Sequence, residues 1–225
     1  IAIPAAKKGF ICFAFTNADS LVMSDGGVRP FFGTNPICFA APRKDEEPFC
    51  VDMALSKTNW NKILMSQNNN QDLEQNIAAD ENGKETIDPH KAHALFPIGG
   101  YKGFALVAMV EVLCGILSGS PFGRDIPSMY KAPMNEPRNI SQFYIIFQSD
   151  FNIHFEDYLK WMDDFTEKVR SEPSLKNNQV LLPNDPQIIS QKIRSKEGIP
   201  IDDQTLKSFD NLKKELQIKS NIDFL

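Results

Sequence analysis

The longest apolar run of the chain, residues 104–117, begins directly after a loop that holds three glycines and one lysine. The sequence there reads FPIGGYKGFALVAMVEVL, from Phe96 to Leu113. The run is shorter than a membrane-spanning segment and Glu111 interrupts it, so it predicts a helix over residues 103–117 that is buried on most of its faces. Glycine lets a backbone approach a ligand closely, and the free N–H groups at the start of the helix would point back at the loop. We therefore take the loop as a candidate cradle for an anionic group.

The composition is that of an ordinary globular protein. Of the 225 residues, 42% are hydrophobic and 24% are charged, and the formal net charge is −5. A negative net charge without a long basic block argues against nucleic acid as the main partner. The four cysteines stand far apart in apolar surroundings, and the chain has only three histidines. We therefore expect free buried thiols, a reducing and cytoplasmic compartment, no metal site and no membrane segment.

Apolar periodicity predicts a mixture of strands and helices. The candidate strands are residues 10–16, 36–41, 49–54 and 141–147. The candidate helices are residues 103–117, 155–170, 187–197 and 202–216, the last with Asp202 or Asp203 as its N-cap. A polar loop is expected at residues 67–75. Four aromatic residues repeat at helical spacing and are therefore expected in the core: Phe155, Tyr158, Trp161 and Phe165. Strands and helices do not alternate regularly and no GxGxxG motif is present, so nothing supports a standard Rossmann site.

Seven segments, in order, resemble the type-2 malate/L-lactate dehydrogenase family, which includes ureidoglycolate dehydrogenase. They are GFICFAFTNA, GGVRPFFGTNPICFAAP, VDMALS, DENGKETIDP, LFPIGGYKGFAL, LSGSPFGRDIPSMY and RNISQFYIIF. They span residues 9–147, and the tail from PNDP to EGIPID resembles the family more loosely. The resemblance implies an α/β fold with a mixed-sheet NAD(P)-binding domain that is not of the Rossmann type, followed by C-terminal helices.

The resemblance also implies an activity. Members of this family transfer a hydride between NAD or NADP and a small 2-hydroxy or 2-oxo acid of the malate, lactate or ureidoglycolate type, and they form homodimers. By resemblance we expect residues 1–150 to be the NAD(P)-binding portion and residues 151–225 the C-terminal helical portion. The chain opens without Met, in what looks like the middle of a helix, and we interpret it as the C-terminal two-thirds of a family member.

Three groups of cofactor-binding residues are implied by the same resemblance. They are Asp52, Met53 and Ala54; Gly100, Lys102 and Gly103; and Pro183, Asn184 and Asp185. The lysine and its glycines would lie against the phosphates, the first group against the nucleotide, and the proline turn would approach from the C-terminal part. In relatives, Ser often stands at the position of Ala18, where its hydroxyl can meet the cofactor, so one hydrogen bond is expected to be lost here.

The resemblance implies no catalytic residue within this chain, because the proton-transferring histidine of the family lies upstream of the matched segments. None of His90, His93 and His154 matches its position. Hydride transfer to a carbonyl needs an acid for the developing alkoxide. We therefore expect the chain by itself to bind cofactor weakly and to catalyse poorly.

Two other functions are open on the sequence. One is a non-catalytic binding or interaction protein that keeps the fold without the catalytic histidine. The other is an enzyme of the same fold with a different acid, such as His93, which would have to lie within hydrogen-bonding reach of the substrate. Residues 33–36 are interpreted as a structural turn, and Arg124 and Arg138 as surface side chains in ion pairs.

Overall fold

The computed structural model describes residues 1–133, 135–175 and 179–218. The chain divides into two compact units, Ile1–Asn184 and Asp185–Leu225. The first unit holds both β-sheets and the helices up to α4, and the second holds α5 and α6. The boundary between the compact units therefore falls after the predicted end of the cofactor-binding portion at residue 150. The division of function between the two predicted portions stays a prediction.

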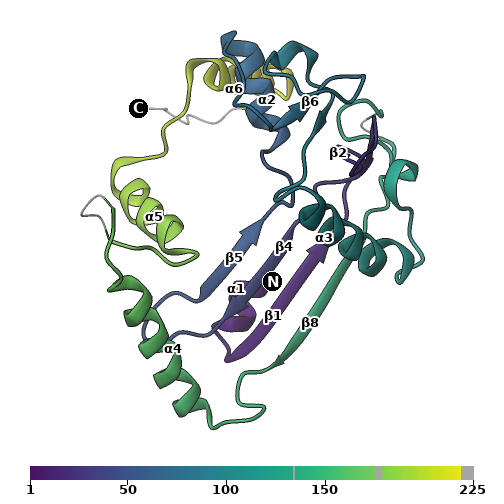
Figure 1. Ribbon diagram of the computed structural model, residues 1–225. Coiled ribbons are helices and arrows are strands. Elements are labelled where there is room, and N and C mark those ends of the chain that lie inside the picture. The colour runs from purple at the N-terminus through teal and green to yellow at the C-terminus, as the bar shows by residue number, and fades with distance from the viewer. Residues whose placement is uncertain (134, 176–178, 219–225) are drawn as a thin grey trace. The chain divides into compact units, whose positions relative to one another are not determined.

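One sheet consists of the four strands that the sequence predicted. They are β1 (Phe10–Thr16), β4 (Ile37–Ala41), β5 (Phe49–Met53) and β8 (Gln142–Gln148), each within one residue of its expected bounds. The strand order is β5-β4-β1-β8 and every neighbouring pair is antiparallel, so β5 and β8 are the edges (Figure 1). The short helix α1 (Ala2–Ala6) packs on one face of this sheet, against Cys12, Ala40 and Cys50.

The second sheet is small and was not predicted. Its strands are β3 (Pro30–Phe32), β2 (Val22–Met23), β7 (Ala94–Leu95) and β6 (Ala78–Ala79), in that order. Only the β2–β7 pair is parallel among the described strands. Helix α2 (Trp60–Asn69) packs on it through Ile63, and η1 (Pro89–Lys91) follows before β7. The predicted polar loop at residues 67–75 is wrong at its start, because α2 continues to Asn69.

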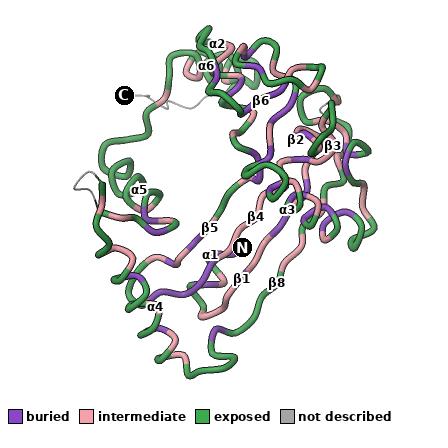
Figure 2. The backbone as a smooth tube through the Cα atoms, in the orientation of Figure 1, coloured by how far each residue is buried: buried purple, intermediate pink, exposed green. Residues whose placement is uncertain are grey.

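The predicted helix at residues 103–117 is present, with a change of geometry along it. It begins as α3 (Tyr101–Glu111) and continues as a π-helical turn, η2 (Val112–Ile116). One side packs on the other face of the four-stranded sheet, with Val107, Val110 and Cys114 against Phe15. The opposite side is exposed, as the alternation of colours along α3 in Figure 2 shows. The expectation that the helix is buried on most faces was therefore wrong, because only one sheet face meets it.

Helix α4 (Phe155–Arg170) has the predicted bounds, but its aromatic residues are not all core. Tyr158 donates a hydrogen bond to the carbonyl of Pro42, and Leu159 is buried. Trp161 is 76% exposed and Phe165 is 45% exposed, so the prediction is wrong for both. Trp161 follows Leu159 by two positions, which places it on the other side of the helix.

The second unit is helical over its described residues. It contains α5 (Asp185–Glu197) and α6 (Asp203–Glu215). Asp202 is the N-cap of α6 and accepts hydrogen bonds from the backbone N–H groups of Gln204 and Thr205, which confirms the predicted cap. Across the described parts of both units, no helix combines the length and the apolar character that crossing a membrane requires.

Candidate functional site

Backbone hydrogen bonds join the segment that follows β5 to the segment that enters the glycine loop. Ile98 N donates to Leu55 O over 2.9 Å, and Lys57 N donates to Phe96 O over 2.9 Å. Ser56 and Pro97 form an isolated antiparallel bridge between these hydrogen bonds. This short ladder brings the end of the Asp52–Ala54 group next to the loop that carries Gly100 and Lys102. Two of the three predicted groups are therefore neighbours.

The glycine loop is open at the start of α3. Gly99 and Gly100 have φ of 61° and 64°, values that favour glycine, and a Cβ at either position would meet nothing within 4 Å. Gly100 is the N-cap of α3 and provides no side-chain cap. The first N–H groups of a helix have no partner inside it, so an uncapped and open helix start can accept an anion.

Gly103 has a different reason to be glycine. It is buried, and a Cβ there would lie 1.8 Å from the carbonyl oxygen of Ile98. This close packing of the first turn of α3 on its own loop accounts for the glycine without a ligand. Contact between Gly103 and a cofactor stays a prediction.

Two exposed residues of the predicted groups carry opposite charges, and neither has a partner among the described residues. Lys102, the second residue of α3, is exposed, and so is Asp52 near the end of β5. Neither side chain forms a hydrogen bond or an ion pair with any of the residues that the structure describes. Met53 is 38% exposed, and Ala54 is half-buried. Charged side chains without partners inside the molecule can accept partners from outside it.

Asp52 lines a pocket of about 140 Å³ on the β1–β4 surface. The other lining residues are Ala14, Phe15, Thr16, Pro36, Ile37, Cys38, Gln142 and Tyr144. Burial, together with the neighbouring Cys50 thiol, raises the pKa of Cys38 to about 12, and the two Sγ atoms lie 3.8 Å apart as free thiols. The Cys38 thiol therefore stays protonated at neutral pH and is a poor nucleophile.

A buried polar network joins the turn at residues 33–36 to helix α3. Asn35, with φ of 36°, donates through Nδ2 to Val107 O over 3.1 Å and to Glu111 Oε2 over 2.5 Å. Its Oδ1 accepts from Ala18 N over 3.1 Å. Glu111 Oε1 accepts from Gly123 N over 2.7 Å. All these groups are used within the fold, which confirms that the turn at residues 33–36 is structural.

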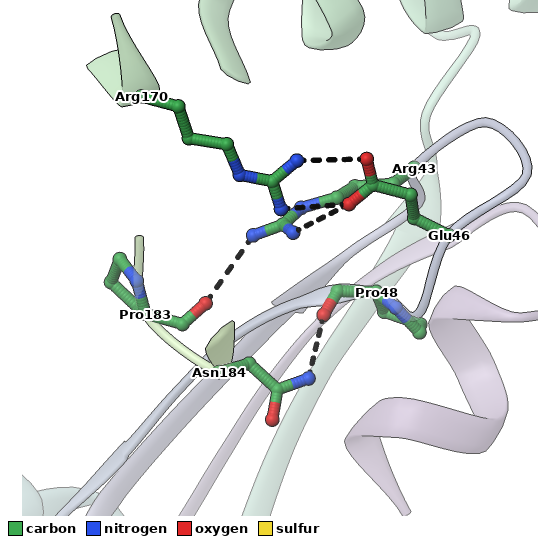
Figure 3. A network of polar contacts seen from close by, with 6 residues as sticks. All are labelled: Arg43, Glu46, Pro48, Arg170, Pro183 and Asn184. Atoms are coloured by element: carbon green, nitrogen blue, oxygen red, sulfur yellow. Dashed lines mark hydrogen bonds and ion pairs between the residues drawn. The ribbon is translucent and has the colours of Figure 1, made fainter. Parts of the chain in front are cut away.

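The Pro183–Asn184 turn is held at the other end of β5 (Figure 3). Arg43 Nη2 donates to Pro183 O over 3.3 Å, and Asn184 Nδ2 donates to Pro48 O over 2.9 Å. Asn184 has φ of 79°, a conformation that asparagine tolerates better than most residues. The side-chain amide of Asn184 therefore holds the turn in place.

Arg43, which holds this turn, belongs to a cluster of charged side chains with Glu46 and Arg170. The side chain of Arg43 is 2% exposed, and its guanidinium lies 5.7 Å from the centroid of the Phe49 ring. Glu46 accepts a hydrogen bond from Arg43 Nη1 over 3.2 Å and two from Arg170, both over 2.8 Å. The bidentate bond from Arg170, with a smaller effect of Arg43, holds the pKa of Glu46 below its usual range. The sequence did not predict this cluster, because the run RKDEE between two prolines has the composition of a solvated loop.

The predicted cofactor residues thus lie at both ends of one edge strand. Pro48 precedes β5, and Asp52 lies four residues further on, so an extended strand separates them by about 14 Å. The structure does not bring these groups into one cluster, and a ligand that contacts both must be elongated. Asp185 begins α5 and belongs to the second unit.

The remaining candidates have structural explanations. Arg138 Nη1 lies 3.7 Å from Asp19 Oδ1, which is the predicted ion pair. The Arg124 guanidinium lies instead 5.2 Å from the centroid of the Phe31 ring, a cation–π contact. His93 is exposed to solvent, which argues against its use as an acid in a closed site. Within the described residues, no group of three or more histidine, cysteine or acidic side chains is placed to hold a metal ion.

Comparison with known sequences gives a consistent answer. The sequence profile of the malate/L-lactate dehydrogenase family matches residues 1–210. The chain is 36% identical over 200 residues to the ureidoglycolate dehydrogenase (NAD(+)) of Escherichia coli K12, covering 88% of this chain and 57% of that protein. It is 35% identical over 161 residues to the (2R)-3-sulfolactate dehydrogenase (NADP(+)) of Chromohalobacter salexigens, covering 70% of this chain and 47% of that protein. The chain thus spans about half the length of these curated relatives.

Solved structures agree. The malate dehydrogenase from Entamoeba histolytica matches with a TM-score of 0.86 over 98% of this chain and 65% of that one, and at 21% identity it shows the fold alone. The sulfolactate dehydrogenase from Methanocaldococcus jannaschii matches with a TM-score of 0.83 at 25% identity, over 96% of this chain and 62% of that one. The predicted mixed α/β fold without a Rossmann arrangement is confirmed, and the chain belongs to the malate/L-lactate dehydrogenase family.

Proposed function

We propose that this chain holds the dinucleotide in an NAD(P)-dependent oxidoreductase that acts on a small 2-hydroxy or 2-oxo acid. One observation carries the proposal: the unpaired Lys102 stands at the open start of α3, beside the segment that follows Asp52. Both NAD(+)- and NADP(+)-dependent dehydrogenases are among the relatives that share this sequence. When bound, the dinucleotide supplies the hydride donor or acceptor.

Each group of residues has a proposed task. The first N–H groups of α3 and the ammonium of Lys102 bind the phosphates, because an uncapped helix start and a free cation both favour an anion. Asp52, Met53 and Ala54 lie along the nucleotide. The Pro183–Asn184 turn bounds the far end of the same strand, and the buried guanidinium of Arg43 keeps it in place. The proposal also includes contacts of Gly103 and Asp185 with the cofactor, as predicted from the sequence. It assigns residues 1–150 to NAD(P) binding and residues 151–225 to the C-terminal helical portion.

This chain contributes no proton-transferring group to the proposed reaction. His90, His93 and His154 are all exposed, and none of them belongs to the three groups of cofactor-binding residues. The substrate is proposed only as a class, the 2-hydroxy and 2-oxo acids of the malate, lactate and ureidoglycolate type. The relatives are dehydrogenases, which does not favour the alternative of a non-catalytic interaction protein.

A homodimer in the cytoplasm is part of the proposal. The exposed side of α3 and η2 and the edge strand β8 carry large apolar side chains: Leu106, Met109, Val112, Ile116, Ile145, Ile146 and Phe147. Apolar edge strands and apolar patches of this kind are typical of surfaces that a partner covers. The four free cysteines support a reducing compartment. Sedimentation equilibrium would test the dimer, and a monomer at all concentrations would contradict it.

Calorimetric titration with NADH and with NADPH tests the proposed function. We expect at least one of them to bind the native chain, and the Lys102→Ala variant to bind it at least about tenfold more weakly, the effect of removing one charge-assisted phosphate contact. Lys8→Ala is the matched control, since Lys8 is also exposed and its side chain has no partner among the described residues. Equal affinity of the native chain and the Lys102→Ala variant would contradict the assignment of the phosphates to the glycine loop.

A further inference from the structure

Three of the four cysteines lie on the face of the main sheet that α1 covers. Cys12 and Cys50 belong to the cluster under α1, and Cys38 packs against the same cluster. The register of β4 and β5 pairs Cys38 with Asp52 and Ala40 with Cys50. Cys38 and Cys50 are therefore diagonal neighbours on one face of the sheet, and their Sγ atoms lie 3.8 Å apart.

The distance between these two sulfur atoms suits a single bridging ion. In the reduced chain the two thiols share a weak hydrogen bond. A disulfide requires a separation of about 2.05 Å, so the sulfurs would have to approach each other by nearly half of their present distance. Two metal–sulfur bonds of about 2.3 Å that meet at a tetrahedral angle place the sulfurs about 3.8 Å apart. The two strands therefore need not move apart to hold an ion.

The surroundings of Cys38 give a cation access to this pair. Cys38 lines the pocket of about 140 Å³ that also contains Asp52. Asp52 is the one residue among those lining the pocket that is ionised at neutral pH, and its carboxylate has no hydrogen bond or ion pair with the described residues. A carboxylate without a cationic partner attracts positive ions. The pocket therefore favours cations over anions at the thiol of Cys38.

We propose that Cys38 and Cys50 together bind one thiophilic metal ion of the Zn²⁺ or Cu⁺ type. Thiolate sulfur is a preferred ligand of these ions, and each thiol that coordinates the ion releases its proton to solvent. Within the described residues, no third histidine, cysteine or acidic side chain is placed to join them, so water or a small ligand from the pocket completes the coordination. The sequence predicted no metal site, because the two cysteines are 12 positions apart and only the pairing of β4 with β5 brings them together.

The proposed ion site is separate from the proposed phosphate site. Helix α3 packs on the opposite face of the sheet, where Val107 and Val110 contact Phe15. An ion held by Cys38 and Cys50 would link the edge strand β5 to its neighbour β4. The inference therefore goes beyond the proposed function and does not depend on dinucleotide binding.

Titration of the reduced chain with each ion, in a buffer free of thiols, tests the proposal. One arm uses Zn²⁺, and the other uses Cu⁺ that ascorbate keeps reduced and a competing chelator buffers. At least one of the two ions is expected to bind, with one ion per chain. Cys38→Ser should weaken its binding by more than about a hundredfold, since the loss of an outer-shell partner alone costs about 10- to 100-fold.

Two features of the design separate a lost site from a lost fold. Cys38 is half-buried and lines an open pocket, so the serine variant should fold, and circular dichroism would check this. Cys114→Ala is the matched control, because Cys114 is a buried cysteine that packs against Phe15 on the opposite face of the sheet. This control should bind the ion as the native chain does.

X-ray absorption spectroscopy of the bound ion counts its sulfur neighbours independently of affinity. We expect two sulfur atoms around each ion, at about 2.3 Å in the Zn²⁺ form. The inference would be overturned if neither ion bound in a ratio of one per chain, if Cys38→Ser kept the native affinity, or if the sulfur count differed from two. Each of these results would leave the proposed function standing, since that function is tested by titration with NADH and NADPH.

Discussion

Two sets of polar side chains lie close to helix α3, and they differ in where their partners are. Asn35 and Glu111 are buried, and their side-chain groups bond to Ala18, Val107, Gly123 and each other. Lys102 and Asp52 are exposed and have no partner among the described residues. A buried polar group without a partner is costly, so the first set must be satisfied inside the fold.

This difference in partners distinguishes residues that stabilise the fold from residues that are proposed to bind a ligand. GTNP and GGYKG are both short motifs of turn-forming residues, and the sequence predicted a structural turn for the first and a ligand-binding loop for the second. In the structure, Asn35 of the first motif bonds only to the protein, whereas Lys102 of the second faces solvent. Stability should therefore depend on the first set and affinity on the second.

The largest effect on stability is expected for Gly103→Ala. The added Cβ would lie 1.8 Å from the Ile98 carbonyl, and backbone must move to relieve this contact. We expect a loss of about 3 kcal/mol or more in the free energy of unfolding, as for severe overpacking. Urea unfolding would measure it, with Gly99→Ala as the control, where the space is open and only the positive φ costs about 1 kcal/mol. Equal stabilities of the two variants would show that Gly103 is not a packing residue.

A smaller but clear loss of stability is expected for Asn35→Ala. The change removes three hydrogen bonds and leaves Glu111 Oε2, a buried acceptor, without the donor that Asn35 supplies. We predict a destabilisation of about 2–3 kcal/mol, the range for unsatisfied buried polar groups. The midpoint of chemical unfolding would reveal it. A variant as stable as the native chain would remove the distinction between the two sets.

The cluster around Glu46 adds a pH-dependent contribution. The pKa of Glu46 is lower in the folded chain than in the unfolded chain, so its ion pairs stabilise the fold at neutral pH and stop doing so as the pH falls below the usual glutamate range. Glu46→Gln should cost on the order of 1 kcal/mol at pH 7, because solvent screens the partly exposed pairs. Urea unfolding of both chains at a series of pH values should show this difference shrinking in acid. A difference that is constant with pH would mean that the charge of Glu46 contributes nothing.

The smallest effect on stability is expected for Lys102→Ala. Its side chain is solvated and unpaired within the described structure, so the free energy of unfolding should change by less than about 0.5 kcal/mol. Thermal unfolding monitored by circular dichroism is sufficient to check this. A loss comparable with that of Asn35→Ala would place Lys102 in the supporting network and weaken its assignment to a ligand.

The sequence predicted the larger elements well and the polar contacts poorly. The strands of the main sheet and helix α4 were found because their apolar periodicity is strong over seven or more residues, or is bounded by proline. Strands β2, β6 and β7 are each two residues long, which is too short to show an alternation of apolar and polar residues. Trp161 was wrongly predicted as a core residue. The helical spacing of the aromatic residues shows which of them lie near one another on the helix, but it does not show how wide the buried face of the helix is.

The residues of the candidate site were named from the sequence, and their arrangement in space was not. Motif resemblance named Asp52 and Lys102, and the ladder that joins the segment after β5 to the segment before α3 is made of backbone groups that no side-chain pattern marks. The position of the Pro183–Asn184 turn depends on Arg43, a charged residue in a charged loop, and nothing in its local sequence distinguishes it from its solvated neighbours.

The most direct test of the account is a crystal structure of this chain with NADH. The account predicts that the ligand lies along the edge strand β5, with its phosphates in hydrogen-bonding distance of Lys102 Nζ and of the first N–H groups of α3. A dinucleotide bound elsewhere, with the start of α3 facing solvent alone, would contradict it.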